Sequence, residues 1–395
     1  MLALGGAGNS VVLVRDLVRN GVTVRASGPK GCLALASRYC SEAFRVPEGE
    51  AVGDYWYRLL LSDDHRLDGS LIFALCDDSI DFICTNYAAL KERYLVEGTD
   101  PELRLAMLDK KKTLEIAREA GVPTPNFWTI NTIEDVDRIK DELTYPLMVK
   151  PIHSHLFSPI FGRKLFIIDE GFANVREKVA LALEHGLEVM IVEMIPGPDS
   201  NLCSYYTYHD EEGRSLFEFT KRVIRRYPYN RGGAVYHETD WVPEAVEEGR
   251  KYFRSMPWRG MANIEFKLDL RDGKLKVIEC NPRFTAAHVL VVASGAPIDT
   301  MIYCSVTGQP GPTFTTYKLD VRQWNPTRDI LAFFEMRKKG LLTFPQWVKS
   351  ILHRPTVLPV FDIRDPMPSL SFLLSLSTRI RKKFHRATER GTHVH

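Results

Sequence analysis

The sequence predicts an α/β domain at the N-terminus, followed by a larger region of α+β type. Near the start, a glycine turn at residues 5–8 separates a short apolar segment from an amphipathic stretch at residues 10–19, and a second apolar segment follows at residues 22–26. This order is typical of a β-α-β unit with parallel strands. Farther along, apolar runs joined by short turns predict antiparallel hairpins, of which residues 264–279 with a turn at 271–273 are the clearest. At about 100 to 200 residues per domain, the chain of 395 residues predicts two or three domains.

The composition excludes several classes of protein. With 45% hydrophobic and 26% charged residues, the chain has the profile of an ordinary folded protein and not of a disordered or fibrous one. The 52 Lys and Arg residues nearly cancel the 50 Asp and Glu residues, so no overall positive field favours nucleic acid. The seven cysteines show no C-x-x-C spacing, which argues against a disulfide framework and a structural zinc site. No apolar run reaches the roughly 18 residues that span a bilayer and no signal-peptide pattern is present, so we expect a cytoplasmic protein.

The C-terminal segment is the one strongly charged part of the chain. Residues 379–390 carry six basic side chains and one acid, and they follow an apolar stretch at residues 370–377. Such a segment can lie on the anionic inner face of a membrane, where each basic residue adds about 1 kcal/mol. The alternative is a helix that packs on the protein and ends in a free tail. Peripheral membrane contact is therefore one of two expectations for this segment.

The predicted elements divide the chain into three parts. Residues 1–107 form the N-terminal α/β domain, residues 108–312 the α+β domain, and residues 313–395 a C-terminal extension with the amphipathic segment and the basic tail. The glycine turn of the first domain differs from the G-x-G-x-x-G dinucleotide fingerprint. It is therefore interpreted as a structural turn between strand and helix, with a dinucleotide site as the alternative.

The clearest hairpin carries the most specific group of polar residues. Alternation along its two strands can place Glu265, Glu279 and Asn281 on one face, so that three oxygen ligands converge. Hard oxygen ligands suit Mg²⁺, which shares itself with substrate phosphates. A solvated face of an ordinary hairpin is the alternative. The acids lie among apolar residues, where a carboxylate without a partner is costly, and this favours the metal site.

Cations that can bind phosphates occur near the ends of predicted elements. Lys150 ends an apolar strand, Lys164 begins the next strand, and Lys110 lies at the start of a helix that Asp109 can cap. A solvated surface charge is the usual role of a lysine, but the two strand-end lysines flank one long loop at residues 153–163. No G-x-x-x-x-G-K-[ST] motif is present, so a P-loop is excluded.

The order of these motifs resembles the ATP-grasp superfamily. Asp-Lys at a helix start, Met-Val-Lys-Pro at a strand end, Val-Glu-Met-Ile-Pro-Gly-Pro-Asp, Glu-Phe-Lys and Ile-Glu-Cys-Asn-Pro-Arg-Phe follow one another in the family's order within residues 108–310. The preceding domain is similar to the pre-ATP-grasp α/β domain, and the remainder then implies a two-lobed ATP-grasp fold. Within the superfamily, the chain is most similar to carboxylate-amine ligases related to D-aspartate ligase, and more distantly to carbamoyl-phosphate synthetase and biotin carboxylase.

The resemblance implies roles for the residues at matching positions. ATP and Mg²⁺ or Mn²⁺ are the implied cofactors, bound between the two lobes. Glu265, Glu279 and Asn281 match the metal ligands between the β- and γ-phosphates. The positions that match nucleotide contacts are Lys110 and Lys150 for the phosphates, Glu193, Met194 and Ile195 for the adenine edge, and Asp199 for the ribose hydroxyls.

One loop departs from the family pattern. The phosphate-covering loop of ATP-grasp enzymes is usually rich in glycine, whereas residues 153–163 contain only Gly162. A stiffer and more hydrophobic lid is implied, and Lys164 at its base remains the expected phosphate contact.

Three arginines are candidates for contacts with the reacting groups. Arg283 matches a family residue beside the γ-phosphate or the acyl phosphate. Arg222 and Arg225 lie in a basic segment and are candidates for binding an acidic substrate or the γ-phosphate, with a solvated basic segment as the alternative. Strand alternation predicts that these two side chains point to opposite faces, so the segment cannot form one continuous patch.

The resemblance implies an ADP-forming ligase that joins a small-molecule carboxylate to an amine, such as an amino acid or a peptide-like substrate. A carboxylate is a poor acyl donor, so ATP first converts it to an acyl phosphate, and an amine then displaces phosphate. Both steps need positioning and charge stabilisation, and no Ser-His-Asp or Cys-His arrangement is required. Carboxyphosphate or carbamoyl-phosphate chemistry ranks lower, because no biotin-bearing or glutaminase segment is visible. A non-catalytic, nucleotide-binding regulatory protein is the third interpretation.

Overall fold

The computed structural model describes residues 1–152, 157, 160–163 and 165–375. Its N-terminal part is a parallel four-stranded sheet in the order β3-β2-β1-β4, which confirms the predicted β-α-β unit. The second strand begins later than the sequence predicts. The strands are β1 (Leu2–Leu4), β2 (Arg25–Gly28), β3 (Ala43–Arg45) and β4 (Ile72–Ala74), and the helices are α1 (Gly8–Arg19), α2 (Val52–Leu61), α3 (Asp77–Thr85), α4 (Tyr87–Lys91) and α5 (Pro101–Ala106).

The next part of the chain forms a smaller antiparallel sheet, with its strands in the order β5-β8-β6-β7. The predicted pairing of the strands on either side of the long loop is confirmed, because β6 pairs with β7. The apolar faces of two helices close the core of this lobe. The elements are α6 (Lys110–Glu119), β5 (Phe127–Ile130), α7 (Ile133–Arg138), β6 (Leu147–Pro151), β7 (Phe166–Ile168), α9 (Phe172–Glu184) and β8 (Val189–Glu193).

The largest sheet has seven strands in the order β13-β12-β9-β10-β11-β14-β15. The predicted hairpin is present, with Asp269 opposite Lys274 at its turn. The N-terminal domain packs on one face of the sheet, and α6 and α10 pack on the other. The elements are β9 (Leu202–His209), β10 (Ser215–Tyr227), β11 (Gly233–Thr239), α10 (Pro243–Arg254), β12 (Gly260–Asp269), β13 (Lys274–Asn281), α11 (His288–Ala293), α12 (Ile298–Thr307), β14 (Arg322–Trp324), α13 (Pro326–Lys338), α14 (Phe344–Ile351) and β15 (Thr356–Val357).

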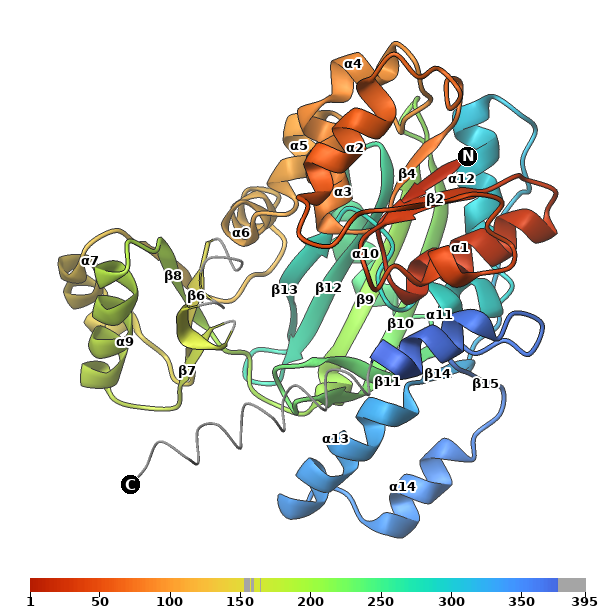
Figure 1. Cartoon of the computed structure of the whole chain (residues 1–395). Helices are drawn as coiled ribbons and strands as arrows, with labels where there is room; N and C mark the ends of the chain where they lie inside the picture. Colours follow the sequence, from red (N-terminus) through yellow and green to blue (C-terminus); the bar gives the residue numbers. More distant parts are fainter. Residues whose placement is uncertain (153–156, 158–159, 164, 376–395) are drawn as a thin grey trace, which may run out of the picture.

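The three sheets occupy three regions of the molecule. Figure 1 shows the small sheet with α7 and α9 as a lobe at the side of the large sheet, and the N-terminal domain above that sheet. The lobes are joined where the chain leaves β8, because the Lys267 ammonium donates to the carbonyl oxygens of Ile195 at 2.9 Å and Gly197 at 3.0 Å. Two short strands of the predicted C-terminal extension, β14 and β15, complete the large sheet.

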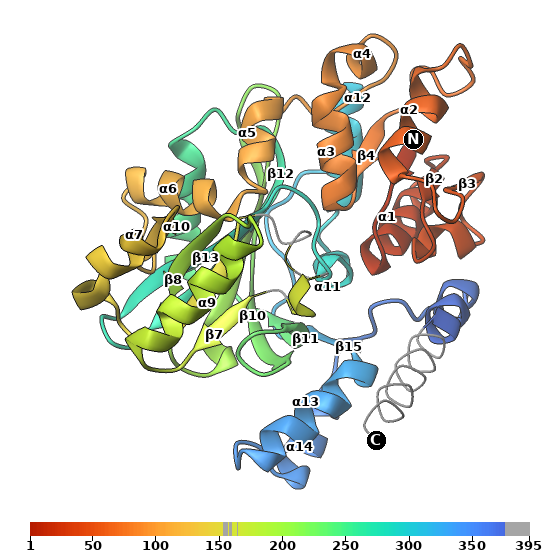
Figure 2. The same ribbon diagram turned by 60° about the vertical axis from the view of Figure 1, so that its left-hand side comes forward.

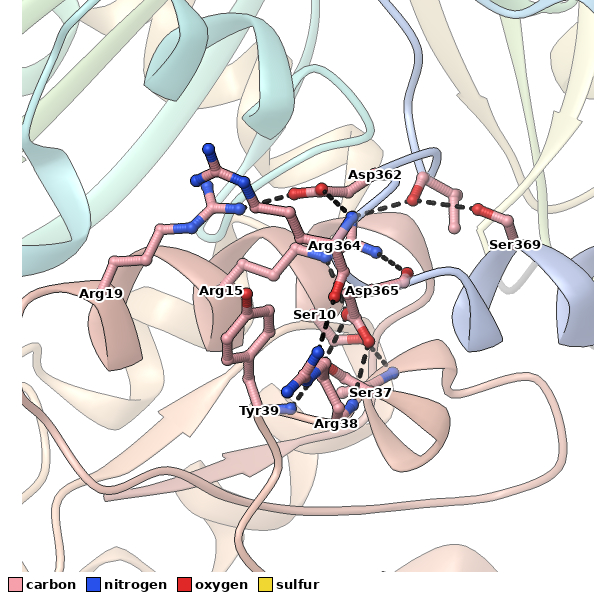
Figure 3. Close-up of polar contacts among 12 residues, drawn as sticks. Ser10, Arg15, Arg19, Ser37, Arg38, Tyr39, Asp362, Arg364, Asp365 and Ser369 are labelled. Atoms are coloured by element: carbon pink, nitrogen blue, oxygen red, sulfur yellow. Dashed lines mark hydrogen bonds and ion pairs between the residues drawn. The ribbon is translucent and has the colours of Figure 1, made fainter.

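A buried carboxylate ties the C-terminal segment to the N-terminal domain. Asp365 has no exposed surface, and its oxygens accept hydrogen bonds from Arg15 Nε at 2.9 Å, Ser37 Oγ at 2.7 Å and the Arg38 backbone N–H at 2.9 Å. Arg15 also donates to the Val360 carbonyl. Figure 3 shows these groups converging on Asp365 from α1 and the loop that follows β2. The segment is therefore held at the end of the protein by a fully paired buried charge.

We predict that Asp365→Ala lowers the free energy of unfolding by about 3–5 kcal/mol, because it leaves the buried Arg15 guanidinium without its counter-ion. Urea denaturation followed by tryptophan fluorescence measures this loss. Glu177→Ala is the matched control, since its ion pair with Lys178 is exposed and is expected to contribute less than about 1 kcal/mol. A loss from Asp365→Ala no larger than that of the control would contradict the anchoring role.

Candidate functional site

Two carboxylates lie directly opposite each other on the hairpin of the large sheet. Glu265 of β12 is in register with Glu279 of β13, and Asn263 is in register with Asn281. Paired residues of neighbouring strands point to the same face, as do residues two apart along one strand. Glu265, Glu279 and Asn281 therefore share one face of the sheet, as predicted. Simple alternation does not produce this arrangement, because the register shift between Glu265 and Phe266 is what sets Glu265 opposite Glu279.

The carboxylate face is the one on which the N-terminal domain packs. The row next to the acids along the strands contains Tyr206 and Phe219, which belong to the core shared with that domain. The residues that flank Glu265 in sequence, Ile264 and Phe266, point the other way into the core beneath α10. The acids thus lie at the margin of a buried face and not on an ordinary solvated one.

Charges of both signs surround the two acids. The pKa of Glu265 is raised, first by its withdrawal from solvent and next by the negative charge of Glu279, while Lys221, Arg226 and Arg283 act in the opposite direction. Two carboxylates this close repel each other, so the pair is disposed to take up a cation. The described residues contain no cluster of three or more His, Cys, Asp and Glu side chains placed to hold a metal. A cation here would depend on two carboxylates, the Asn281 amide and oxygen atoms from a ligand.

The neighbouring polar groups fit such a cation site. Ser204 of β9 is the cross-strand neighbour of Glu265, and its Oγ is buried. Asn263, two residues before Glu265 on β12, is also fully buried, and its Oδ1 is buried with it. Within the described part of the chain, neither oxygen has a hydrogen-bond partner. Orphaned oxygens and opposed carboxylates are the hard ligands that Mg²⁺ and its bound waters require.

Lys221 is a site residue that the sequence reasoning missed. It is buried on β10, and its row across the sheet runs through Ser204 and Glu265 to Glu279. Its withdrawal from solvent lowers its pKa, and the Glu265 carboxylate opposes that effect. The signal in the sequence was a lysine in the interior of a strand of alternating apolar residues. Lys221 is one of four basic side chains in residues 221–226, and the sequence does not distinguish it from the three arginines.

Lys150 of β6, in the small sheet, lies close enough to the acid pair for the charge of Glu279 to act on it. Withdrawal from solvent lowers its pKa to about 8, and the two charges that act on it are Glu279 of the large sheet and Lys110. Lys110 begins α6, whose Asp109 cap accepts hydrogen bonds from two backbone N–H groups as predicted. The structure therefore gathers Lys110, Lys150 and the acid pair from α6, β6 and the β12–β13 hairpin. Lys164, predicted beside them, lies outside the described residues.

The segment that the resemblance predicts as the adenine contact lies at the end of β8. Glu193 ends that strand, and its carboxylate is buried in an ion pair with Arg271 at 2.5 Å. The Met194 N–H donates to the Pro146 carbonyl, and the Ile195 carbonyl accepts from Lys267. Hydrogen bonds to its backbone thus hold the segment in place between the two lobes. The Glu193 side chain is occupied by its ion pair with Arg271.

Asp199 is engaged by the protein itself. Both of its carboxylate oxygens accept hydrogen bonds, from the Arg226 backbone N–H and Nε and from the Asn230 backbone N–H. It is 2% exposed. A ligand hydroxyl at this predicted ribose contact would have to displace one of these donors.

The structure does not bring Arg222 and Arg225 to the acid pair. Arg222 is in register with Cys203, the neighbour of Ser204 in sequence, so it points to the opposite face, where it pairs with Asp240 at 2.5 Å. Arg225 is buried in a two-pronged ion pair with Asp329 at 2.7 and 2.9 Å. The predicted alternation between the two arginines is also wrong, because the register shifts between Val223 and Arg225 and sets both on one face.

Arg283 lies at the junction with the N-terminal domain. Its Nε pairs with Asp77, the first residue of α3, at 2.7 Å, and its charge reaches Glu265. The following residue, Phe284, accepts a hydrogen bond at its carbonyl from the Asn9 side chain in the first turn of α1. The start of α1, next to the glycine turn, therefore contacts the segment that follows β13.

Comparisons with known proteins place this arrangement. No family model matches the chain. It is 26% identical to the D-aspartate ligase of Enterococcus faecium, over 57% of this chain and 56% of that one. It is 40% identical to a putative D-alanine–D-lactate ligase of Streptomyces coelicolor, over 52% and 62% of the two chains, and 30% identical to a D-alanine–D-alanine ligase of Thermoanaerobacter, over 49% and 58%. The aligned part spans about half the length of such curated relatives.

Solved structures share the fold at lower identity. A biotin carboxylase from Campylobacter jejuni superposes with a TM-score of 0.63 at 15% identity, over 81% of this chain and 74% of that chain. An L-amino acid ligase from Bacillus licheniformis gives 0.55 at 18% identity, over 77% and 73%. These likenesses show that the chain shares the overall fold of these enzymes.

We predict that Glu265→Gln makes the protein more resistant to urea at pH 8 in the presence of a chelator, because it removes one charge of the opposed pair. The pKa of Glu265 is raised in the folded state, so the stability linked to its protonated form is present at low pH and is lost as the pH rises through that pKa. The gain from the substitution should therefore shrink toward pH 4. Glu177→Gln, at an exposed site, should show no such pH dependence. Equal gains at both pH values would contradict the repulsion between the acids.

Proposed function

Because this chain has the ATP-grasp fold, we propose that it is an ATP- and Mg²⁺-dependent, ADP-forming ligase that activates a carboxylate as an acyl phosphate and joins it to an amine. The observation that carries the proposal is the acid pair Glu265–Glu279 facing Lys150 of the other lobe. An acid pair on one sheet and a lysine on the other can hold the two ends of a metal-bound triphosphate.

The proposed roles of the residues follow from their positions. Glu265, Glu279 and Asn281 would hold Mg²⁺, or Mn²⁺ in its place, and the metal would neutralise charge on the β- and γ-phosphates. Lys150 and Lys221 would lie against phosphate oxygens. Withdrawal from solvent lowers the pKa of Lys150 and so disfavours its ammonium form, while Glu279 opposes this effect. Phosphate oxygens beside Lys150 would favour the ammonium form further.

The two chemical steps need little from the protein beyond positioning. A carboxylate oxygen of the substrate attacks the γ-phosphorus, and ADP leaves. The amine nitrogen then attacks the acyl carbon, and phosphate leaves with the bonding electrons while the amine loses a proton. Negative charge on the phosphoryl oxygens grows in both steps, and Arg283 with the lysines would stabilise it. Lys110 and Lys164 are proposed as further phosphate contacts, and residues 193–195 as the adenine contact.

The substrates are proposed to be amino acids or peptide-like molecules. The relatives named above are ligases of D-aspartate, of D-alanine and of L-amino acids. The carboxylate would lie beyond the γ-phosphate, near Arg283 and the glycine turn of the N-terminal domain.

We predict that the protein releases ADP and phosphate when ATP and Mg²⁺ are supplied with the correct pair from a panel of amino acids that includes D-aspartate. Glu279→Ala should lower this rate at least about 100-fold, since it removes a metal ligand needed for charge stabilisation. Glu170→Ala, at an exposed site, is the matched control. Release of AMP and pyrophosphate would exclude the acyl-phosphate route, and full activity of Glu279→Ala would contradict the metal assignment.

A second candidate is carboxyphosphate or carbamoyl-phosphate chemistry. The chain is also 25% identical to the C-terminal section of a carbamoyl phosphate synthase large chain from Methanopyrus kandleri, over 48% of this chain and 35% of that one. This candidate predicts that ADP release depends on bicarbonate and needs no other carboxylate. A nucleotide-binding protein without turnover, the third candidate, would bind ATP and Mg²⁺ and release no ADP with any pair.

The chain is proposed to act in the cytoplasm, at the inner face of the membrane. Among the described residues, no helix is both long and apolar enough to cross a bilayer. Support for contact with the membrane surface comes from the basic C-terminal sequence and from exposed apolar side chains on α13 and α14.

A further inference from the structure

The C-terminal elements concentrate the exposed apolar side chains of the protein. Of the 18 large apolar side chains that are exposed in the described residues, 12 lie between residues 330 and 374. On most soluble proteins such side chains are scattered singly. A concentration of this kind marks an interaction surface.

The outward face of α13 is apolar. Phe333 is buried against the protein, whereas Ile330, Leu331 and Phe334 are exposed by 42%, 45% and 59%. Leu341 continues this stripe just beyond the helix and is 49% exposed. Residues spaced by three and four along a helix share one side, so the stripe points away from the large sheet.

The second helix adds to the same surface. α14 is amphipathic, yet none of its residues is buried. Its Trp347 stacks on Phe333 with ring centroids 4.9 Å apart, which joins the two helices, while Phe344 is 55% exposed. Both views show α13 and α14 projecting from the molecule on the side away from the N-terminal domain (Figures 1 and 2). We call the exposed side chains of this pair the apolar tip: Ile330, Leu331, Phe334, Leu341 and Phe344.

Basic side chains accompany the apolar tip. Residues 330–354 contain five basic side chains and one acid, Glu335, which accepts a hydrogen bond from the Tyr229 N–H. Arg337 and Lys338 in the last turn of α13, and Lys339 at its end, are exposed and lie shortly before Leu341 in the chain. Apolar side chains surrounded by lysines suit a surface that is apolar within and anionic at its rim.

We propose that the apolar tip docks on an anionic lipid bilayer, with its five apolar side chains entering the headgroup region and the neighbouring basic side chains lying against lipid phosphates. The charge decides between lipid and protein as the occupant. Protein interfaces are depleted in lysine, whereas juxtamembrane surfaces are enriched in it. This proposal does not depend on the ligase activity, because none of its residues touches the acid pair or its cations.

Co-sedimentation of the full chain with vesicles tests the proposal. Vesicles of phosphatidylcholine with about 30% phosphatidylglycerol should bind the protein, vesicles of phosphatidylcholine alone should bind it far less, and binding should fall as salt is raised. The variant with both Phe334→Ser and Leu341→Ser should bind at least about tenfold more weakly, since it removes two of the inserted side chains. Lys338→Glu with Lys339→Glu should weaken binding to the anionic vesicles.

The matched control carries Leu270→Ser and Leu319→Ser, at apolar positions exposed by 66% and 53% elsewhere on the protein. It should bind like the native chain. Equal binding by the Phe334→Ser, Leu341→Ser variant and the native chain would overturn the assignment of the surface. A native chain that ignores anionic vesicles but forms a dimer, which that variant abolishes, would show that the occupant is a second copy of the chain. Urea denaturation of the variant, followed by tryptophan fluorescence, would recognise a folding defect.

Discussion

The register of the β12–β13 hairpin is the constraint on which the rest of the site depends. It holds Glu265 directly opposite Glu279, so two like charges share one partly buried face. That arrangement opposes folding unless positive charge is close by. The positive charge comes from different parts of the chain: Lys221 from the same sheet, Lys150 from the small sheet, and Arg283 from the segment that meets the N-terminal domain. The acid pair therefore links the large sheet to the small sheet through Lys150. Through Arg283, which pairs with Asp77, it is also linked to the N-terminal domain.

Several other charges that the fold withdraws from water are paired, and these pairs stabilise the structure around the acid pair. Arg225 and Arg15 each face a carboxylate with no exposed surface, and Lys267 donates to two carbonyls between the lobes. A buried charge that lacks its partner costs several kcal/mol, so such pairs are maintained once formed. By contrast, Ser204 Oγ and Asn263 Oδ1 beside the acids lack partners within the described chain. The paired charges stabilise the structure, and two of the buried oxygens that lack a partner lie at the site that is proposed to bind metal and nucleotide.

The sequence predicted much of this arrangement where the evidence was local. Alternation predicted that Glu265 and Glu279 share one face, and they do, but only because the register shifts between Glu265 and Phe266. Regular pairing from the turn would point the two acids to opposite faces. The same reasoning failed for Arg222 and Arg225, since a register shift in β10 changes the side to which the second arginine points. Lys221 was overlooked because its role comes from pairing with β9 and, through β9, with β12, and no spacing within β10 announces that neighbour.

By itself, the sequence determined the order of the elements, the turn that makes the acid pair possible and the resemblance that names the fold, since each depends on residues close together in the chain. Only the tertiary structure decided which charges remain for a ligand. Arg225 and Asp199 are taken up by protein partners, whereas Lys150 is brought from a separate sheet toward Glu279. The physical reason is that the strength of a charge interaction depends on distance and burial, and those are set by packing between segments far apart in sequence.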